Sequence, residues 1–116
     1  MNNLIYLRNI LNLRTIIILG LAFIWANDPP EITPIENQST EEEVDLTLLI
    51  IASDIDGDNL SYSAVCSNYG VLISLDSNEL TLFPILDWNG TVDVTVTVND
   101  DGDPSLSAIE TFELLV

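Results

Sequence analysis

The chain has 116 residues and a formal net charge of −17, from 19 acidic residues against two arginines, with no lysine or histidine. This length allows one small domain. Both arginines, Arg8 and Arg14, precede the first acidic residue, so residues 27–116 hold every carboxylate and no base. Nucleic acid is excluded as a partner because phosphate contacts need Lys or Arg. The positive charge must come from outside the chain, and hard divalent cations prefer oxygen ligands.

The first 26 residues differ in character from the rest. Residues 1–14 are polar and weakly basic, and residues 15–26 form a 12-residue apolar run that ends in the small residue Ala26. This order is typical of a cleaved secretory signal. The alternative is a retained membrane anchor, although the run falls short of the roughly 20 residues that span a bilayer. We therefore expect a secreted or cell-surface protein, anchored in the membrane through residues 15–26 if these are retained.

The remainder of the chain has the two-residue period of β-strands. Residues 91–98 alternate a polar residue with valine, so one face of that strand is expected to be core and the other wet. Residues 44–52 are richer in apolar residues and are expected to be buried on much of both sides. The predicted strands are residues 31–33, 44–52, 60–66, 71–75, 79–83, 91–98 and 108–116. About seven short strands separated by Asp-, Asn-, Gly- and Pro-rich turns predict an all-β Greek-key sandwich.

Two of the turns concentrate carboxylates. They hold Asp54, Asp56 and Asp58 in one loop and Asp100, Asp101 and Asp103 in the other. Calcium takes six to eight oxygens, and alternate residues of a loop can turn toward one ion. An EF-hand is excluded because Gly57 is fourth and Val65 twelfth, where that loop needs Gly at position six and Glu at twelve. The loops predict calcium in a β context, and the alternative is a pair of solvated turns.

Three further features have structural rather than chemical interpretations. Cys66 lies in phase with the apolar face of the strand at 60–66, so we expect a buried, inert thiol. The glutamates at 41–43 are expected to be a solvated charge run, and Trp88 is expected to pack over a loop rather than bind sugar. Without His or Lys, and with no imidazole for Cys66, we expect no enzymatic activity.

Four stretches of the sequence resemble cadherin-like repeats, including those arranged in tandem in bacterial adhesins. The Asn-Asp-Pro-Pro at 27–30 is similar to the Asn-Asp-x-x-Pro linker between repeats, shortened by one residue, and the Glu-Asn at 36–37 is similar to that of the first strand. Residues 52–59 match the Ala-x-Asp-x-Asp-x-Gly-type signature after the second strand. Residues 98–107 resemble the x-x-Asp-x-Gly-x-Pro-x-Leu-Ser stretch between the last two strands, and together the four cover residues 27–116.

The resemblance implies one immunoglobulin-like (cadherin-like) sandwich at residues 27–116 that binds calcium and serves in adhesion or as a rigid spacer. At the pole nearest the linker, it implies the calcium ligands Asn27, Asp28, Asp54, Asp56 and Asp100, with Asp58 and Asp101 as further candidates. At the opposite pole it implies Glu36 and Asp87, with Asn89 where the family has a glutamate.

The partners that the resemblance implies are calcium, neighbouring repeats of the same or another chain, and a cell-surface protein or glycan. The alternative function is that of an immunoglobulin-like ligand-binding domain, for example for glycan, in which the acidic residues confer solubility and calcium has no structural role.

Overall fold

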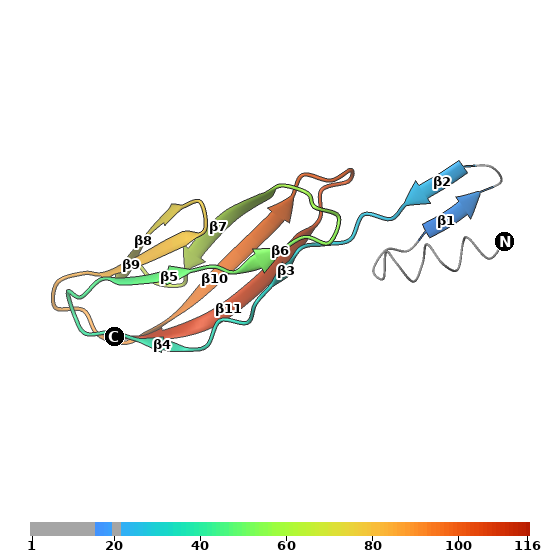
Figure 1. Ribbon diagram of the computed structural model, residues 1–116. Coiled ribbons are helices and arrows are strands. Elements are labelled where there is room, and N and C mark those ends of the chain that lie inside the picture. The colour runs from blue at the N-terminus through green and yellow to red at the C-terminus, as the bar shows by residue number, and fades with distance from the viewer. Residues whose placement is uncertain (1–15, 20–21) are drawn as a thin grey trace.

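The computed structural model describes residues 16–19 and 22–116, and these residues form strands, turns and loops without a helix (Figure 1). An N-terminal hairpin pairs β1 (Ile16–Leu19) antiparallel with β2 (Ala22–Trp25). A search of the described residues finds no helix with the length and apolar character needed to cross a membrane. The basic segment predicted at 1–14 lies outside the described residues, so export and the fate of residues 1–26 stay predictions.

Nine strands build the domain that follows, in two layers (Figure 1). One layer is a sheet in the order β4-β11-β10-β7, and the other joins the sheet β5-β9-β8 to the pair β3-β6. Every pairing is antiparallel except that of β4 with β11. The strands are β3 (Glu31–Ile32), β4 (Gln38–Ser39), β5 (Leu46–Leu49), β6 (Ala52–Ser53), β7 (Leu60–Cys66), β8 (Val71–Asp76), β9 (Glu79–Pro84), β10 (Thr91–Asp100) and β11 (Ser107–Leu115). The predicted all-β, immunoglobulin-like sandwich is confirmed.

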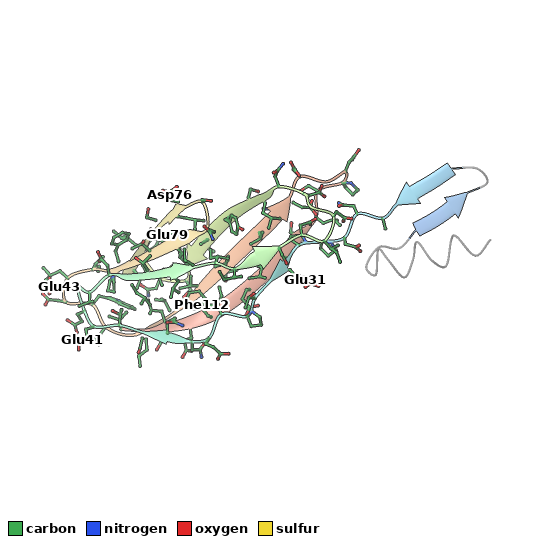
Figure 2. All side chains as sticks on the ribbon, viewed as in Figure 1. Glu31, Glu41, Glu43, Asp76, Glu79 and Phe112 are labelled. Carbon is green, nitrogen blue, oxygen red and sulfur yellow. The ribbon has the colours of Figure 1, made fainter. Side chains whose placement is uncertain are left out.

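Strand β10 carries the centre of the core. Its four valines, at positions 92, 94, 96 and 98, are each at most 1% exposed, while Thr91 and Asp93 face solvent. The valines pack with Leu80 and Leu82 of β9 and with Phe112 of β11, which lies between the layers in Figure 2. Because burial of one such side chain contributes about 1.5–3 kcal/mol, the alternating pattern at 91–98 specifies both the strand and its inward face.

The predicted strand at 44–52 differs from the structure in two ways. It is divided into β5 and β6, because β5 pairs with β9 whereas β6 pairs with β3. At the break, Ile50 is buried and its N–H donates to the Asn78 carbonyl at 2.8 Å. Leu49 and Ile51 are 61% and 56% exposed, so the expected burial on both sides was wrong. A sandwich has only two layers, and the outer face of each meets water.

The interpretations of Trp88 and the glutamates at 41–43 agree with the structure. Trp88 packs against the core and over Gly70, where an added Cβ would lie 2.1 Å from Trp88 Cε2. The three glutamates are exposed. Cys66 is half-buried rather than fully buried, and desolvation raises the pKa of its thiol, as expected of an unreactive cysteine.

Candidate metal centre

The pairing of the strands brings three acidic segments to one end of the sandwich. Leu60, the first residue of β7, pairs with Asp100, the last of β10, so the loops beyond them leave the sheet side by side. Glu31 pairs with Ser53, which brings the N-terminal linker to the same end. We call this end, made of residues 27–31, 54–59 and 100–106, the linker pole. Figure 2 shows Glu31 here, and Glu41 and Glu43 at the opposite end.

Asp54 folds the first loop around its own side chain. Its Oδ1 accepts hydrogen bonds from the N–H groups of Asp56, at 2.8 Å, and Asp58, at 3.2 Å. Gly57 completes the turn with a φ of 78°, in the left-handed region that favours glycine. As a result Asp54, Asp56 and Asp58 each present one carboxylate oxygen within 4.8 Å of the others. The alternate spacing of these acids predicted this cluster.

Asp100 likewise folds the second loop around its own side chain, and it is 4% exposed. Its Oδ1 accepts from the N–H groups of Gly102, at 3.1 Å, and Leu106, at 2.8 Å. The hydroxyl of Ser105 donates to the Asp100 carbonyl at 2.6 Å. The loop therefore closes over Asp100 and removes its carboxylate from solvent.

The linker contacts both loops. The N–H of Asp28 donates to Oδ2 of Asp56 at 2.7 Å, and Nδ2 of Asn27 donates to the Pro104 carbonyl at 2.6 Å. The Asn27 amide lies against Gly102, where an added Cβ would come within 2.4 Å of Nδ2. A side chain at position 102 would displace Asn27, so glycine is required there for the linker to approach.

Each of the three segments contributes one buried carboxylate oxygen that has no hydrogen-bond donor within the described part of the chain. These atoms are Oδ2 of Asp28, of Asp54 and of Asp100. A buried polar atom that is left without a hydrogen-bond partner costs about 1–3 kcal/mol, and no base follows Arg14 to offset that cost. A hard divalent cation prefers such oxygens as ligands. These three carboxylate oxygens therefore fit calcium. The linker pole also has an open hollow of about 490 Å³, which is lined by Asp28, Pro29, Glu31, Ser53, Asp54 and Ile55.

The electrostatics of the linker pole oppose a fully ionised cluster. The pKa of Asp58 is raised, first by desolvation and then by the negative charges of Asp54, Asp101, Asp100 and Asp56. A cation would reverse that repulsion, because an opposite charge nearby favours the ionised form.

Asp101 has a different environment from the other acids of this end. Its Oδ1 accepts from the backbone N–H of Asn59, and its Oδ2 accepts from Nδ2 of Asn59, both at 2.8 Å. These bonds lower the pKa of the Asp101 carboxyl. Asn59 was not among the predicted site residues, because its role depends on Asp101, which lies 42 residues away in the sequence.

The candidates of the opposite pole are placed apart from any such cluster. Glu36 and Asp87 are exposed, and among the described residues neither belongs to a group of three potential metal ligands. Asn89, which stands where the family has a glutamate, donates from Nδ2 to Oε1 of Glu42 at 2.9 Å.

The comparison with solved structures finds two similar proteins. The first is a nucleoside hydrolase-related hypothetical protein from Saccharophagus degradans that is associated with carbohydrate metabolism, with a TM-score of 0.67 and 24% identity over 78% of this chain and 26% of that one. The second is an endo-fucoidan hydrolase of glycoside hydrolase family 107, with a TM-score of 0.46 and 19% identity over 86% of this chain and 14% of that one. The chain thus spans about a quarter or less of these proteins. At 24% identity, the likeness to the first shows the fold alone.

No curated protein matches the sequence significantly. The family of cadherin-like domains matches residues 26–114, which is most of the chain and includes the linker, both acidic loops and, except for Leu115 at the end of β11, the nine strands of the sandwich. The protein therefore belongs to the cadherin-like domain family.

Proposed function

We propose that this protein is a non-catalytic extracellular module that binds calcium at the linker pole and serves in adhesion or as a rigid spacer. Membership of the cadherin-like family supports the extracellular setting. The observation that carries the calcium proposal is the set of three buried, unpartnered carboxylate oxygens, on Asp28, Asp54 and Asp100. They come from three separate segments, so one cation shared among them would join the linker to both loops.

The residues of the linker pole have distinct tasks in this proposal. Asp28, Asp54 and Asp100 would hold the ion with their buried oxygens, and Asp56 and Asp58 would add oxygens from the cluster beside Asp54. Calcium supplies the positive charge that the domain lacks. The chain itself fixes the linker by the bond from Asp28 N–H to Asp56, so the direction of the polypeptide entering the domain is set by the same residues.

The test is thermal melting of the full chain, followed by circular dichroism, in 10 mM calcium and then in excess chelator. Extracellular modules bind calcium with Kd of about 10⁻⁴–10⁻³ M, which at this concentration stabilises the fold by about 1.4–2.7 kcal/mol. For a domain of this size the midpoint should rise by about 5–15 °C. A midpoint that does not move would overturn the calcium proposal.

Substitution locates the effect. Asp54→Ala removes both the buried oxygen and the acceptor that folds the loop, so most of the calcium-dependent rise should disappear. The matched control is Asp87→Ala, which removes an exposed carboxylate at the opposite pole and should leave the rise intact. An unchanged response in the Asp54 variant would place the site elsewhere.

The second candidate is a glycan-binding domain in which the acidic residues only confer solubility. It is favoured by the fold shared with a protein associated with carbohydrate metabolism. The two functions give opposite results in one pair of measurements. Melting that is insensitive to calcium, together with retention on a polysaccharide column in chelator, would favour glycan binding.

A further inference from the structure

Asn59 connects the two acidic loops of the linker pole directly, with two hydrogen bonds to one carboxylate. Its backbone N–H donates to Oδ1 of Asp101 and its side-chain Nδ2 donates to Oδ2, both at 2.8 Å. Two parallel bonds fix the orientation of the carboxylate, and bonds to an ionised acceptor are roughly twice as strong as neutral ones. We call this contact the Asn59–Asp101 clamp.

The clamp joins two segments that otherwise repel each other. Each loop carries three carboxylates, and the chain has no base beyond Arg14 to place between them. The linker contacts each loop through a separate hydrogen bond, from Asp28 to Asp56 in the first loop and from Asn27 to Pro104 in the second. The clamp crosses from one loop to the other using only a neutral amide, a backbone N–H and a single carboxylate.

Two consecutive acids of the second loop differ in what they contact. Asp100 is buried, and its Oδ2 has no donor among the described residues. Asp101 is exposed, and both of its oxygens accept hydrogen bonds from Asn59. The first has an oxygen available for a cation, whereas the second is already engaged by the neighbouring loop.

We propose that Asn59 is a positioning residue for the calcium site: by holding Asp101, it keeps the two acidic loops at ligand spacing before the ion binds, and neither residue of the clamp is a ligand. This inference rests on the proposed calcium function and adds to it what sets the affinity. Asp101 thereby changes from a candidate ligand to half of the clamp. The cost of bringing the loops together is met during folding, so less of the binding free energy is spent on it.

The test exchanges the two partners. Asn59→Asp places two carboxylates opposite each other and breaks the side-chain bond. Asp101→Asn replaces the ionised acceptor with a neutral amide, so only a weaker amide–amide bond can form. In the double variant, the new amide at position 101 donates to the new carboxylate at position 59 and still accepts from the backbone N–H. The double variant also keeps the net charge of the natural chain.

The measurement is calcium affinity of the full chain by isothermal titration calorimetry, with melting in chelator to verify the fold. Residues that orient metal ligands typically change affinity by 10–100-fold, and for this exposed pair we expect each single variant to bind about tenfold more weakly. The double variant should return to within about threefold of the natural chain. A role in folding alone would instead lower the melting midpoint of the single variants in chelator, whereas a positioning role changes affinity while the chain stays folded. The control is Asp103→Asn, which removes an exposed charge from the same loop and should change affinity less than about threefold.

The outcomes separate this inference from the proposed function. If the natural chain binds no calcium, the proposed function fails and the inference fails with it. If the natural chain binds calcium and the single variants bind it equally well, the inference alone fails. It also fails if the affinity of the double variant is as low as the two single losses multiplied together. Should either single variant not fold, Asn59→Ala, which retains the backbone hydrogen bond, provides the weakened clamp.

Discussion

The two ends of the sandwich are closed by different means. At the linker pole, Asp28, Asp54 and Asp100 each have one buried carboxylate oxygen. At the other end, where β10 begins, Trp88 lies over Gly70 and Gly90. A Cβ added to Gly70 would lie 2.1 Å from the Trp88 ring, and one added to Gly90 would lie 3.2 Å from it. We call this second end the Trp88 end. Val116 closes it further through two backbone hydrogen bonds with Gly90, at 2.9 and 3.2 Å.

The difference shows that the number of acidic residues does not by itself mark a cation site. The Trp88 end also carries acids, at 41–43 and at Asp87, but they are exposed and water solvates them. Its interior is filled by an aromatic ring that needs no ion. At the linker pole the interior is lined by oxygens, and three of them have no donor in the described chain. One end should therefore be stable without a ligand, and the other should depend on one.

The largest effect is expected from Gly70→Ala, which tests the packing of the Trp88 end. The new Cβ would overlap the Trp88 ring, and overpacking of this kind costs about 1–3 kcal/mol. The midpoint of melting should fall by about 5–20 °C, by the same amount in calcium and in chelator. The control, Ser74→Ala on the exposed face of the same layer, should stay within about 0.5 kcal/mol of the natural chain. A fall that calcium reverses would show that the two ends are coupled.

The next effect is expected from Asp100→Asn, which tests the linker pole. The amide keeps an oxygen for the N–H groups of Gly102 and Leu106, so the loop retains its shape. It replaces the buried, unpartnered oxygen with an NH₂ group that cannot bind a cation. The rise in melting midpoint with calcium should be almost abolished.

The same substitution at the Trp88 end is the control for this prediction. Asp87→Asn also removes one negative charge, but from an exposed position. It should leave the calcium-dependent rise within about a degree of that of the natural chain, because exposed, separated charges are largely screened. Equal losses in both variants would mean that calcium acts through net charge rather than at a site.

Most of the fold could be predicted from the sequence because its signal lies within single strands. The valines of 91–98 specify β10, and the ends of β7 and β10 place both acidic loops at one pole. The two-residue strand β4 was not predicted, since it has no period of its own and forms only by pairing with Leu114 and Leu115. The break at Ile50 was not predicted either, because it reflects a change of partner strand.

The candidate site was predictable to the extent that its residues are close in sequence. The cluster of Asp54, Asp56 and Asp58 follows from alternate spacing within one loop. The burial of Asp100 and the engagement of Asp101 by Asn59 depend on contacts between distant segments. Two neighbouring aspartates are equivalent in the sequence, and only the packing of the loops distinguishes them.

The smallest effect is expected from Asp58→Asn, which tests the repulsion between carboxylates at the linker pole. Desolvation and the surrounding carboxylates raise the pKa of Asp58 above its usual 3.8. The folded state thus binds this proton more tightly than the unfolded state, and the stability that Asp58 contributes is present below about pH 3.8 and lost as the pH rises through the raised value. At pH 7 in chelator, the variant should therefore melt slightly higher than the natural chain, the effect being small because solvent screens an exposed charge.

That advantage should vanish under two separate conditions, low pH and the presence of calcium. At a pH well below 3.8 both chains carry an uncharged group at position 58, so their midpoints should converge. In calcium at pH 7 the order should reverse, because the natural chain gains an ionised oxygen beside Asp54 and Asp56 that the variant lacks. Asp101 has the opposite sign: its pKa is lowered by Asn59, so its contribution is present above the usual pKa and lost as the pH falls. The contribution of Asp101 is the same in the variant and in the natural chain, so it cancels in the difference between their melting midpoints. A variant that melts higher in calcium as well would make Asp58 a purely repulsive charge and remove it from the set of ligands.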